Sequence, residues 1–330
     1  MSEQSRRPND EEIKPYVIVS TILASSGSRA TVYRGFHEAT LEHVAIKTTN
    51  TTELSKTLLE CLQREIEILR LLSHRHIVKL LEVFHAERHV HLIFEFCAGG
   101  TLANYILKRG RVEGLEYIPS LGAAPTYYQH PKAGGLDELV VRNFLRQLAR
   151  AIKFLRQHAV VHRDITPQNI LLHPASSSEI SRGQPLGIPI LKLADFSFSR
   201  SLPDAMMAET LCGSPLYMAP EILRYQKYDA KVDLWSVGAV LYEMAVGKAP
   251  FRAQNHIELL KKIETFKNIK FPDEDPQVRA RSIANGEELK PVPNDIKGLI
   301  RSLLKRLPQE RCSFDDFFKS RAVQNSKFPR

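Results

Sequence analysis

The hydrophobic pattern of the chain changes at Gly99-Gly100, and this change limits the folds that it can adopt. Before the glycine pair, five short β-rich runs are predicted at 16–22, 30–36, 43–48, 83–85 and 90–94. One helical stretch, 56–72, interrupts them, with apolar residues and one glutamate at helical spacing: Leu58, Leu62, Glu65, Ile66 and Leu69. After the pair, helical patterns dominate at 136–158, 236–246, 256–267 and 294–305. The sequence therefore predicts a small sheet with one helix, followed by a mainly helical unit.

The boundaries of these units follow from composition. Residues 1–14 are polar and lack apolar periodicity, which indicates a flexible arm. We expect the small unit over 15–97, the larger unit over 98–320 and a tail over 321–330. Stretches rich in Gly and Pro at 110–135 and 174–189 are predicted surface insertions, and 273–293 is a polar connection.

Composition and charge exclude several classes of protein. The chain has 330 residues, of which 43% are hydrophobic and 25% charged, so it is neither disordered nor fibrous. It has no run of about 18 uncharged apolar residues, and its first residues lack the apolar core of a signal peptide, so we expect a cytoplasmic chain without a transmembrane segment. The net charge of +9 favours anionic partners. No basic stripe is interleaved with aromatic residues, so we expect no nucleic-acid partner.

Four segments contain the residues suited to catalysis. The run V-H-R-D-I-T-P-Q-N at 161–169 places Asp164 and Asn169 five positions apart, where they can accept a hydroxyl proton and bind a metal ion. Asp195 ends an apolar strand and is a natural second Mg²⁺ ligand. Upstream, V-A-I-K ends at Lys47, which is suited to contact phosphates, and Glu65 is placed on the following helix to hold that lysine.

In this order the motifs resemble those of the eukaryotic protein kinases across 16–318. Further matches are A-P-E at 219–221, Asp233, Trp235, Gly238 and Arg311. The resemblance implies an α+β, two-lobed protein kinase fold, with a small β-rich N-lobe carrying one helix, a larger mainly α-helical C-lobe, and ATP between them. It also implies that Glu221 pairs with Arg311 and that Asp233 braces the catalytic loop.

Among the kinases, the chain most resembles the autophagy-initiating serine/threonine kinases of fungi. The matching residues are E-T-L-C-G-S-P-L-Y-M-A-P-E at 209–221, L-R-Y at 223–225, K-Y-D-A-K at 227–231 and the insertion after Gly110. The resemblance implies an ATP- and Mg²⁺-dependent protein serine/threonine kinase that acts on protein substrates. It also implies autophagy-initiation proteins as partners and peripheral recruitment to autophagy-related membranes.

The resemblance assigns a role to each candidate residue. Asp164 is the base, Lys47 contacts phosphates while Glu65 holds it, and Asn169 and Asp195 bind the metal. The implied ATP-binding residues are Ser25, Gly27, Val32, Ala45, Lys47, Glu95 and Cys97. For Glu95 and Cys97, it is the main chain that is expected to hold the adenine. Thr210 occupies the position of the activating phosphorylation, and the resemblance makes Arg163 the cation that receives its phosphate.

Several positions depart from the kinase pattern. The glycine-rich loop falls on Ser25, Gly27 and Ala30, so only its middle glycine remains. Thr166 replaces a lysine that offsets charge on the transferred phosphoryl group, and Ser197 replaces the glycine after Asp-Phe. These departures favour an alternative function, that of a catalytically impaired pseudokinase serving as a binding or scaffolding module.

A histidine-rich segment contains His85, His89 and His91. Histidines are common metal ligands, but these alternate along a predicted hairpin with no nearby cysteine. That pattern is typical of a polar strand face, and we assign no metal ligand there.

Overall fold

The computed structural model describes residues 10–24, 30–201, 215–285 and 290–326. They divide into two compact units: unit 1 comprises Met1–His74 and Val78–Cys97, and unit 2 comprises Arg75–Ile77 and Ala98–Arg330. Unit 1 contains an antiparallel sheet and unit 2 is mainly helical. The predicted α+β class is confirmed.

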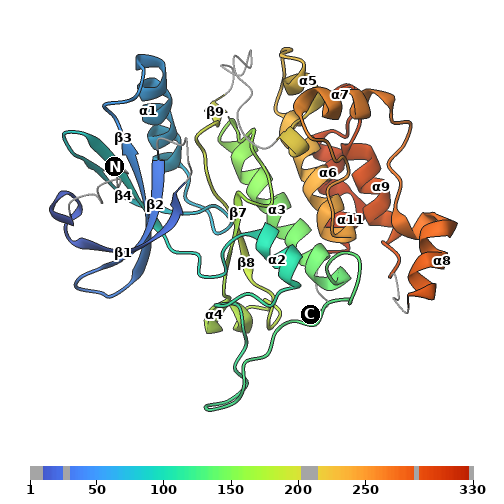
Figure 1. Ribbon diagram of the computed structural model, residues 1–330, viewed down its shortest axis with the longest axis horizontal. Coiled ribbons are helices and arrows are strands. Elements are labelled where there is room, and N and C mark those ends of the chain that lie inside the picture. Colours follow the sequence, from blue (N-terminus) through green and yellow to red (C-terminus); the bar gives the residue numbers. More distant parts are fainter. Residues whose placement is uncertain (1–9, 25–29, 202–214, 286–289, 327–330) are drawn as a thin grey trace, which may run out of the picture. The chain divides into compact units, whose positions relative to one another are not determined.

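Unit 1 is built on a five-stranded sheet with the strand order β1-β2-β3-β5-β4 (Figure 1). All neighbouring strands are antiparallel, which short loops between consecutive strands permit. The strands are β1 (Tyr16–Ala24), β2 (Ala30–His37), β3 (His43–Asn50), β4 (Leu80–His85) and β5 (His89–Glu95). A 3-10 helix, η1 (Asp10–Ile13), precedes the sheet, and helix α1 (Lys56–Leu71) connects β3 to β4.

The two faces of this sheet have different surroundings. Along β3, Val44 and Ile46 point to one face, where they join an apolar core with Ile13 and Tyr16 from the N-terminal segment. Lys47 points to the other face and contacts α1. We call the face that holds Val44 and Ile46 the outer face of the sheet.

The buried face of helix α1 lies nearer its C-terminal end than its sequence predicted. The buried side chains are those of Leu62, Glu65, Ile66, Ile68 and Leu69. Leu58 was expected among them but is 37% exposed. The whole segment 56–60 is exposed, so the buried face begins one turn later than its apolar residues suggest.

Regular structure begins earlier in the chain than we expected. Residues 10–14 were predicted to belong to a flexible arm, but Asp10–Ile13 forms η1 and the side chain of Ile13 is fully buried. Burying one such side chain contributes about 1.5–3 kcal/mol toward holding the segment against the sheet. A single apolar residue among charged neighbours gives no periodicity, so the sequence did not reveal it.

The histidine-rich strands also differ from the prediction of a polar face. His85 in β4 is exposed, as that prediction requires, but His91 in β5 is fully buried on the outer face. Its ring hydrogen-bonds Thr48 of β3, which lies directly opposite in the register. The side chains alternate between the two faces of the strand as predicted. The face of His91, however, is covered by the segment that contains η1, which we expected to be part of a flexible arm.

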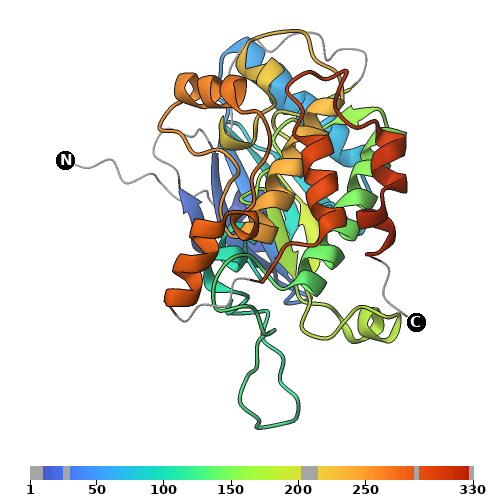
Figure 2. The same ribbon diagram turned by 90° about the vertical axis from the view of Figure 1, so that its right-hand side faces the viewer.

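Unit 2 is organised around the helices α3 (Glu138–Gln157), α6 (Lys231–Val246) and α9 (Asn294–Leu303) (Figure 2). Trp235 of α6 is fully buried. A Cβ atom at Gly238 would lie 2.8 Å from the Cβ of Leu303, so glycine allows α6 and α9 to approach closely. The other helices are α2 (Leu102–Lys108), α4 (Ser177–Ser181), η2 (Pro215–Tyr217), α5 (Pro220–Leu223), α7 (His256–Thr265), η3 (Pro272–Glu274), α8 (Pro276–Ala284), α10 (Phe314–Lys319) and α11 (Arg321–Gln324).

Two short strand pairs in unit 2 hold the segments that contain the candidate catalytic residues. Strand β6 (Val160–Val161) pairs with β9 (Arg200–Ser201), and β7 (Ile170–His173) pairs with β8 (Ile190–Leu193). The loop 162–169 therefore lies between β6 and β7. The loop 194–199 lies between β8 and β9, so both loops are fixed at each end.

The insertions lie in unit 2. The segment 110–135 projects from the helices of unit 2 (Figure 2), and a bridge between Tyr117 and Thr126 closes it. Its return is fixed by His130, which hydrogen-bonds the hydroxyl of Tyr105 at 3.1 Å. The predicted connection 273–293 contains a helix that we did not expect, α8, which begins after the N-cap residue Asp275. Among the described residues, no helix combines the length and apolar character needed to cross a membrane.

Candidate active site

The candidate residues divide between the two units. Unit 1 contains Val32, Ala45, Lys47, Glu65, Glu95 and Cys97. Unit 2 contains Asp164, Asn169 and Asp195. Ser25, Gly27 and Thr210 lie outside the described residues.

Lys47 and Glu65 form the ion pair that we predicted in unit 1. The Nζ atom of Lys47 lies 2.8 Å from Oε1 of Glu65, and their side chains are 17% and 5% exposed. Removing one partner of such a pair leaves the other charge poorly solvated, which is strongly unfavourable. The pair therefore fixes the position of the lysine ammonium relative to β3.

Two of the other unit 1 candidates share the sheet face of Lys47, and two lie at or just beyond the end of β5. Val32 is directly opposite Lys47 in the register of β2 and β3, and Ala45 precedes the lysine by two residues, so all three share a face. Glu95 ends β5, and its carboxylate accepts a hydrogen bond of 2.7 Å from the backbone N–H of Lys79. Cys97 follows and is buried. The side chain of Glu95 thus binds the residue before β4, while our prediction concerns its main chain.

Asp233 braces the loop that contains Asp164, as predicted. Its carboxylate accepts hydrogen bonds from the backbone N–H groups of His162 at 2.9 Å and Arg163 at 2.8 Å. Arg163 has a φ of 71°, an uncommon conformation for a residue with a side chain. Burial raises the pKa of Asp233 to about 6, although the two backbone hydrogen bonds act to lower it.

His162 connects this loop to the segment that contains Asp195. Its Nδ1 atom accepts from the backbone N–H of Asp164 at 3.3 Å, so Nε2 donates to the carbonyl of Ala194 at 3.1 Å. Burial lowers the pKa of His162 to about 4, which keeps the ring neutral. We predicted no role for this residue, although its place before Arg163-Asp164 in the sequence was an available signal.

Asp164 and Asn169 are in direct contact. The amide Nδ2 of Asn169 donates to Oδ2 of Asp164 at 2.6 Å and to the Asp164 carbonyl at 3.0 Å. The backbone N–H of Asn169 also donates to the hydroxyl of Thr166 at 3.2 Å, and Thr166 is buried. Thr166 therefore stabilises the turn between the two residues. From the sequence we had considered only that threonine lacks the positive charge of the usual lysine.

Asp195 lies in a strained turn beside Ser197. Its φ is 60°, and its carboxylate Oδ1 accepts a hydrogen bond of 2.5 Å from the Ser197 hydroxyl. The intervening Phe196 is buried against the ring of His162. Serine in place of the usual glycine reduces backbone freedom here, and its hydroxyl also binds the candidate metal ligand, which the sequence did not reveal.

The oxygen atoms of these side chains suit Mg²⁺. The carboxylate of Asp195 is accessible, and the amide nitrogen of Asn169 is turned toward Asp164, which leaves the amide oxygen to face a cation. Carboxylate and amide oxygens are hard ligands of the type that Mg²⁺ prefers. The donor set therefore fits the metal that the sequence predicted.

Arg163, which we predicted to receive a phosphate from Thr210, has contacts of its own. Its guanidinium donates to the carbonyl of Phe198 at 3.2 Å and lies 5.0 Å from the centre of the Tyr228 ring. The interaction with Thr210 stays a prediction.

A second predicted ion pair joins distant parts of unit 2. Arg311 donates to both carboxylate oxygens of Glu221, at 2.7 and 2.9 Å, and both side chains are buried. Arg311 also donates to the carbonyl of Lys231, the first residue of α6. This paired geometry is the strong form of a charged hydrogen bond.

Comparison with known families accounts for this set of contacts. The sequence profile of the protein kinase domain matches residues 23–323. The chain belongs to the protein kinase family. Within the kinases, its similarity to fungal serine/threonine kinases confirms the resemblance seen in the motifs.

The relatives of this kinase domain share close to half of its residues. It is 49% identical over 315 residues to the serine/threonine-protein kinase atg1 of Neosartorya fischeri, covering 90% of this chain and 31% of that protein. It is 48% identical over 339 residues to the corresponding kinase ATG1 of Mycosarcoma maydis, covering 98% and 34%. Against atg1 of Schizosaccharomyces pombe it is 48% identical over 322 residues, covering 95% and 36%. The chain thus spans about a third of the length of the curated relatives it matches.

Proposed function

We propose that this chain is an ATP-dependent protein serine/threonine kinase domain, which transfers the γ-phosphate of ATP to serine or threonine hydroxyls of protein substrates. The observation that carries the proposal is the 2.8 Å ion pair between Lys47 and Glu65. Protein kinases need this pair in place for catalysis, because the lysine contacts the phosphates of ATP. The names of the fungal relatives, which describe serine/threonine-protein kinases, support the same activity.

Each retained residue has a chemical task in this proposal. Lys47 binds phosphate oxygens, and Asp164 orients the substrate hydroxyl and accepts its proton. Asn169 and Asp195 hold Mg²⁺, which neutralises charge on the phosphates when it is bound. Asp233 and His162 are positioning residues, because each hydrogen-bonds the backbone of the loop that contains Asp164.

We further propose that the physiological substrates and partners are autophagy-initiation proteins, and that the kinase acts in the cytoplasm with peripheral recruitment to autophagy-related membranes. The motifs at 209–221 and 227–231 and the identity to the fungal relatives support this assignment. Replacing the matching domain of the Schizosaccharomyces pombe relative with this chain tests it. Restored autophagy on starvation is expected, and an active chimera that does not restore it would contradict the assignment.

A phosphotransfer assay tests the kinase activity. Purified protein with Mg-ATP and a generic basic substrate is expected to transfer phosphate, and Asp164→Asn is expected to abolish the transfer, because the amide cannot accept the proton. Asp315→Asn is the matched control, since Asp315 is exposed on α10 and far along the chain from the candidate site. If wild type and Asp164→Asn give the same background while ATP still binds, the chain is a pseudokinase.

A further inference from the structure

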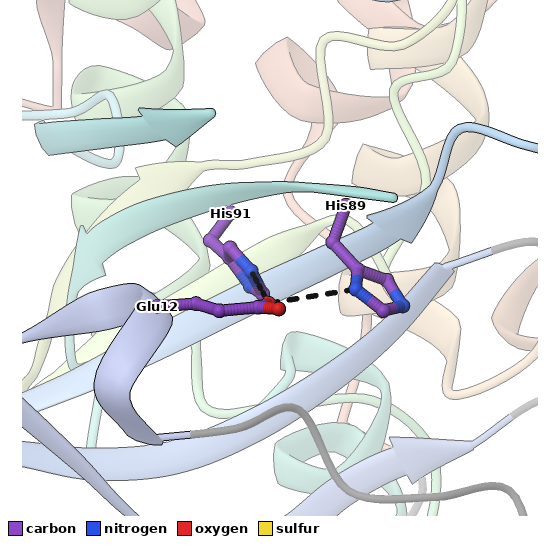
Figure 3. Close-up of side chains that lie close together, drawn as sticks. All are labelled: Glu12, His89 and His91. Atoms are coloured by element: carbon purple, nitrogen blue, oxygen red, sulfur yellow. Dashed lines mark hydrogen bonds and ion pairs between the residues drawn. The ribbon is translucent and has the colours of Figure 1, made fainter. Parts of the chain in front are cut away.

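Three side chains with metal-ligating atoms meet on the outer face of the sheet in unit 1 (Figure 3). Glu12 comes from η1, and His89 and His91 come from β5. Oε2 of Glu12 lies 3.2 Å from Nε2 of His91 and 3.5 Å from Nδ1 of His89. One carboxylate oxygen therefore faces two imidazole nitrogens.

We propose that Glu12, His89 and His91 bind a divalent transition-metal ion of the zinc class. Imidazole nitrogens suit Zn²⁺ and its neighbours, whereas Mg²⁺ prefers oxygen ligands alone. Three protein ligands that include histidine and glutamate, with a fourth position for water, are a common zinc arrangement. The site differs in ligand chemistry from the oxygen donors of Asn169 and Asp195.

The distances between the ligand atoms agree with tetrahedral coordination. Metal to ligand distances of about 2.0–2.2 Å place two ligand atoms roughly 3.3–3.5 Å apart at the tetrahedral angle. The two distances from Glu12, 3.2 and 3.5 Å, match this value. All three ligand atoms lie within 4.8 Å of one another, so only a small rotation of a side chain is needed to complete the site.

Thr48 orients the buried ligand as a supporting residue does in metal sites. Its hydroxyl lies 2.9 Å from Nδ1 of His91, the ring nitrogen that faces away from Glu12. A histidine ligand usually has its second nitrogen hydrogen-bonded in this way, which fixes the ring and its tautomer. Because a hydroxyl can donate or accept, Thr48 allows His91 to present either a proton or a lone pair to Glu12.

His89 provides independent support. Its Nδ1 atom is buried and has no hydrogen-bond partner in the described part of the chain, although it points at the carboxylate of Glu12. A buried polar atom without a hydrogen bond is unfavourable, and a metal ion between the nitrogen and the carboxylate would satisfy both. The side chains of Glu12 and His89 are 31% and 28% exposed, so an ion can reach the site from solvent.

The site would hold the N-terminal segment against the sheet. Glu12 precedes the buried Ile13 and lies before residue 23, where the match to the protein kinase domain begins. An ion bound to Glu12 and to the histidines of β5 would therefore attach a segment that precedes the protein kinase match to the outer face of the sheet. This face is opposite to the one that holds Lys47. The metal would act by stabilising unit 1 and not in phosphate transfer.

Calorimetric titration of the complete chain with ZnCl₂, after removal of any histidine tag, tests the proposal. Wild type is expected to show a saturable site, and Glu12→Gln and His89→Gln to weaken it by more than about 100-fold because each removes a ligand. Thr48→Val is expected to weaken it by about 10- to 100-fold, as loss of a supporting hydrogen bond does. His85→Gln is the matched control, since His85 is exposed and outside the cluster. Zinc binding that Glu12→Gln and His89→Gln leave unchanged would overturn the proposal.

Hydrogen exchange of the wild-type chain gives a second test that does not depend on variants. Zinc is expected to slow amide exchange in η1 and β5 at least severalfold, with no change in α6 or α9 of unit 2. Equal exchange with and without zinc in η1 and β5 would overturn the site even if the variants failed to fold.

Discussion

Ser197 has an effect on Asp195 that loss of glycine alone does not explain. Its hydroxyl donates to the carboxylate at 2.5 Å, and the same oxygen is a candidate Mg²⁺ ligand. A hydrogen bond to a charged group contributes about 1.5–3 kcal/mol, and exposure of Asp195 to solvent reduces this value. The hydroxyl therefore competes with the metal for part of the carboxylate.

Ser197→Ala is expected to lower the Mg²⁺ concentration needed for half-maximal phosphotransfer by about threefold to tenfold, because it removes this competing donor. The measurement is a Mg²⁺ titration at a fixed ATP concentration. Ser181→Ala is the control, since its hydroxyl is also exposed but bonds only a backbone carbonyl in α4. An unchanged Mg²⁺ requirement would show that the hydroxyl does not compete with the metal, and a higher one would show that it orients Asp195 for the metal.

Asp233 is expected to make stability depend on pH. Its pKa is raised by burial from 3.8 to about 6 in the folded chain, so between these values the folded state binds more protons than the unfolded state. Stability contributed by this group is therefore highest below about pH 4 and declines as the pH rises toward 6. Each pKa unit corresponds to about 1.4 kcal/mol, so the change is on the order of 3 kcal/mol.

Urea unfolding of wild type and Asp233→Asn from pH 4 to 7 measures this effect. The amide does not titrate, so wild type is expected to lose stability relative to the variant as the pH rises. A difference that stays constant, or that changes in the opposite direction, would show that the two backbone hydrogen bonds outweigh burial in setting the pKa.

At the level of helices and strands, the sequence predicted those elements whose periodicity is uninterrupted. The five strands, α1, α3, α7 and α9 appear near their predicted bounds. Helix α6 begins at Lys231, five residues before its predicted start, because the polar Asp233 in its first turn is buried against the loop and not exposed. Helices η1 and α8 were among those missed, because one is too short for a period and the other is almost entirely exposed and has no regular apolar period.

For the candidate site, the sequence predicted the residues but not all of their contacts. Lys47, Glu65, Asp164 and Asn169 were found from motif spacing, since kinase chemistry fixes the residue types at those positions. Contacts that depend on how loops fold were not predictable, among them the Thr166 hydroxyl that accepts from Asn169. Such contacts arise between side chains whose directions the local sequence does not determine.

The packing of α6 on α9 gives a prediction at this same level. Gly238→Ala is expected to destabilise unit 2 by about 1–3 kcal/mol, because its Cβ would approach Leu303 to 2.8 Å and overpack the contact. Gly298→Ala in α9 meets nothing within 4 Å and is expected to stabilise by up to about 1 kcal/mol through helix propensity. Denaturant unfolding compares the two. Equal effects of the same sign would show that propensity, and not packing, determines the outcome.

For the molecule as a whole, the buried pair of Glu221 and Arg311 connects two segments that are 90 residues apart in unit 2. The single tryptophan, Trp235, lies in α6 with the guanidinium of Arg311 5.4 Å from its ring centre. Because Trp235 lies next to Arg311, tryptophan fluorescence reports the unfolding of unit 2 in the region that this ion pair stabilises. Circular dichroism reports both units together.

Glu221→Ala is expected to reduce the stability of unit 2 by about 3–5 kcal/mol, because it leaves the Arg311 charge buried without its partner. The double variant with Glu221→Met and Arg311→Met is expected to be less destabilised than Glu221→Met or Arg311→Met alone, since no buried charge then remains. Denaturant unfolding followed by Trp235 fluorescence measures all of these variants. If the effects of the two single methionine substitutions simply add in the double variant, the two residues contribute independently, and the pair does not hold the segments around Glu221 and Arg311 together.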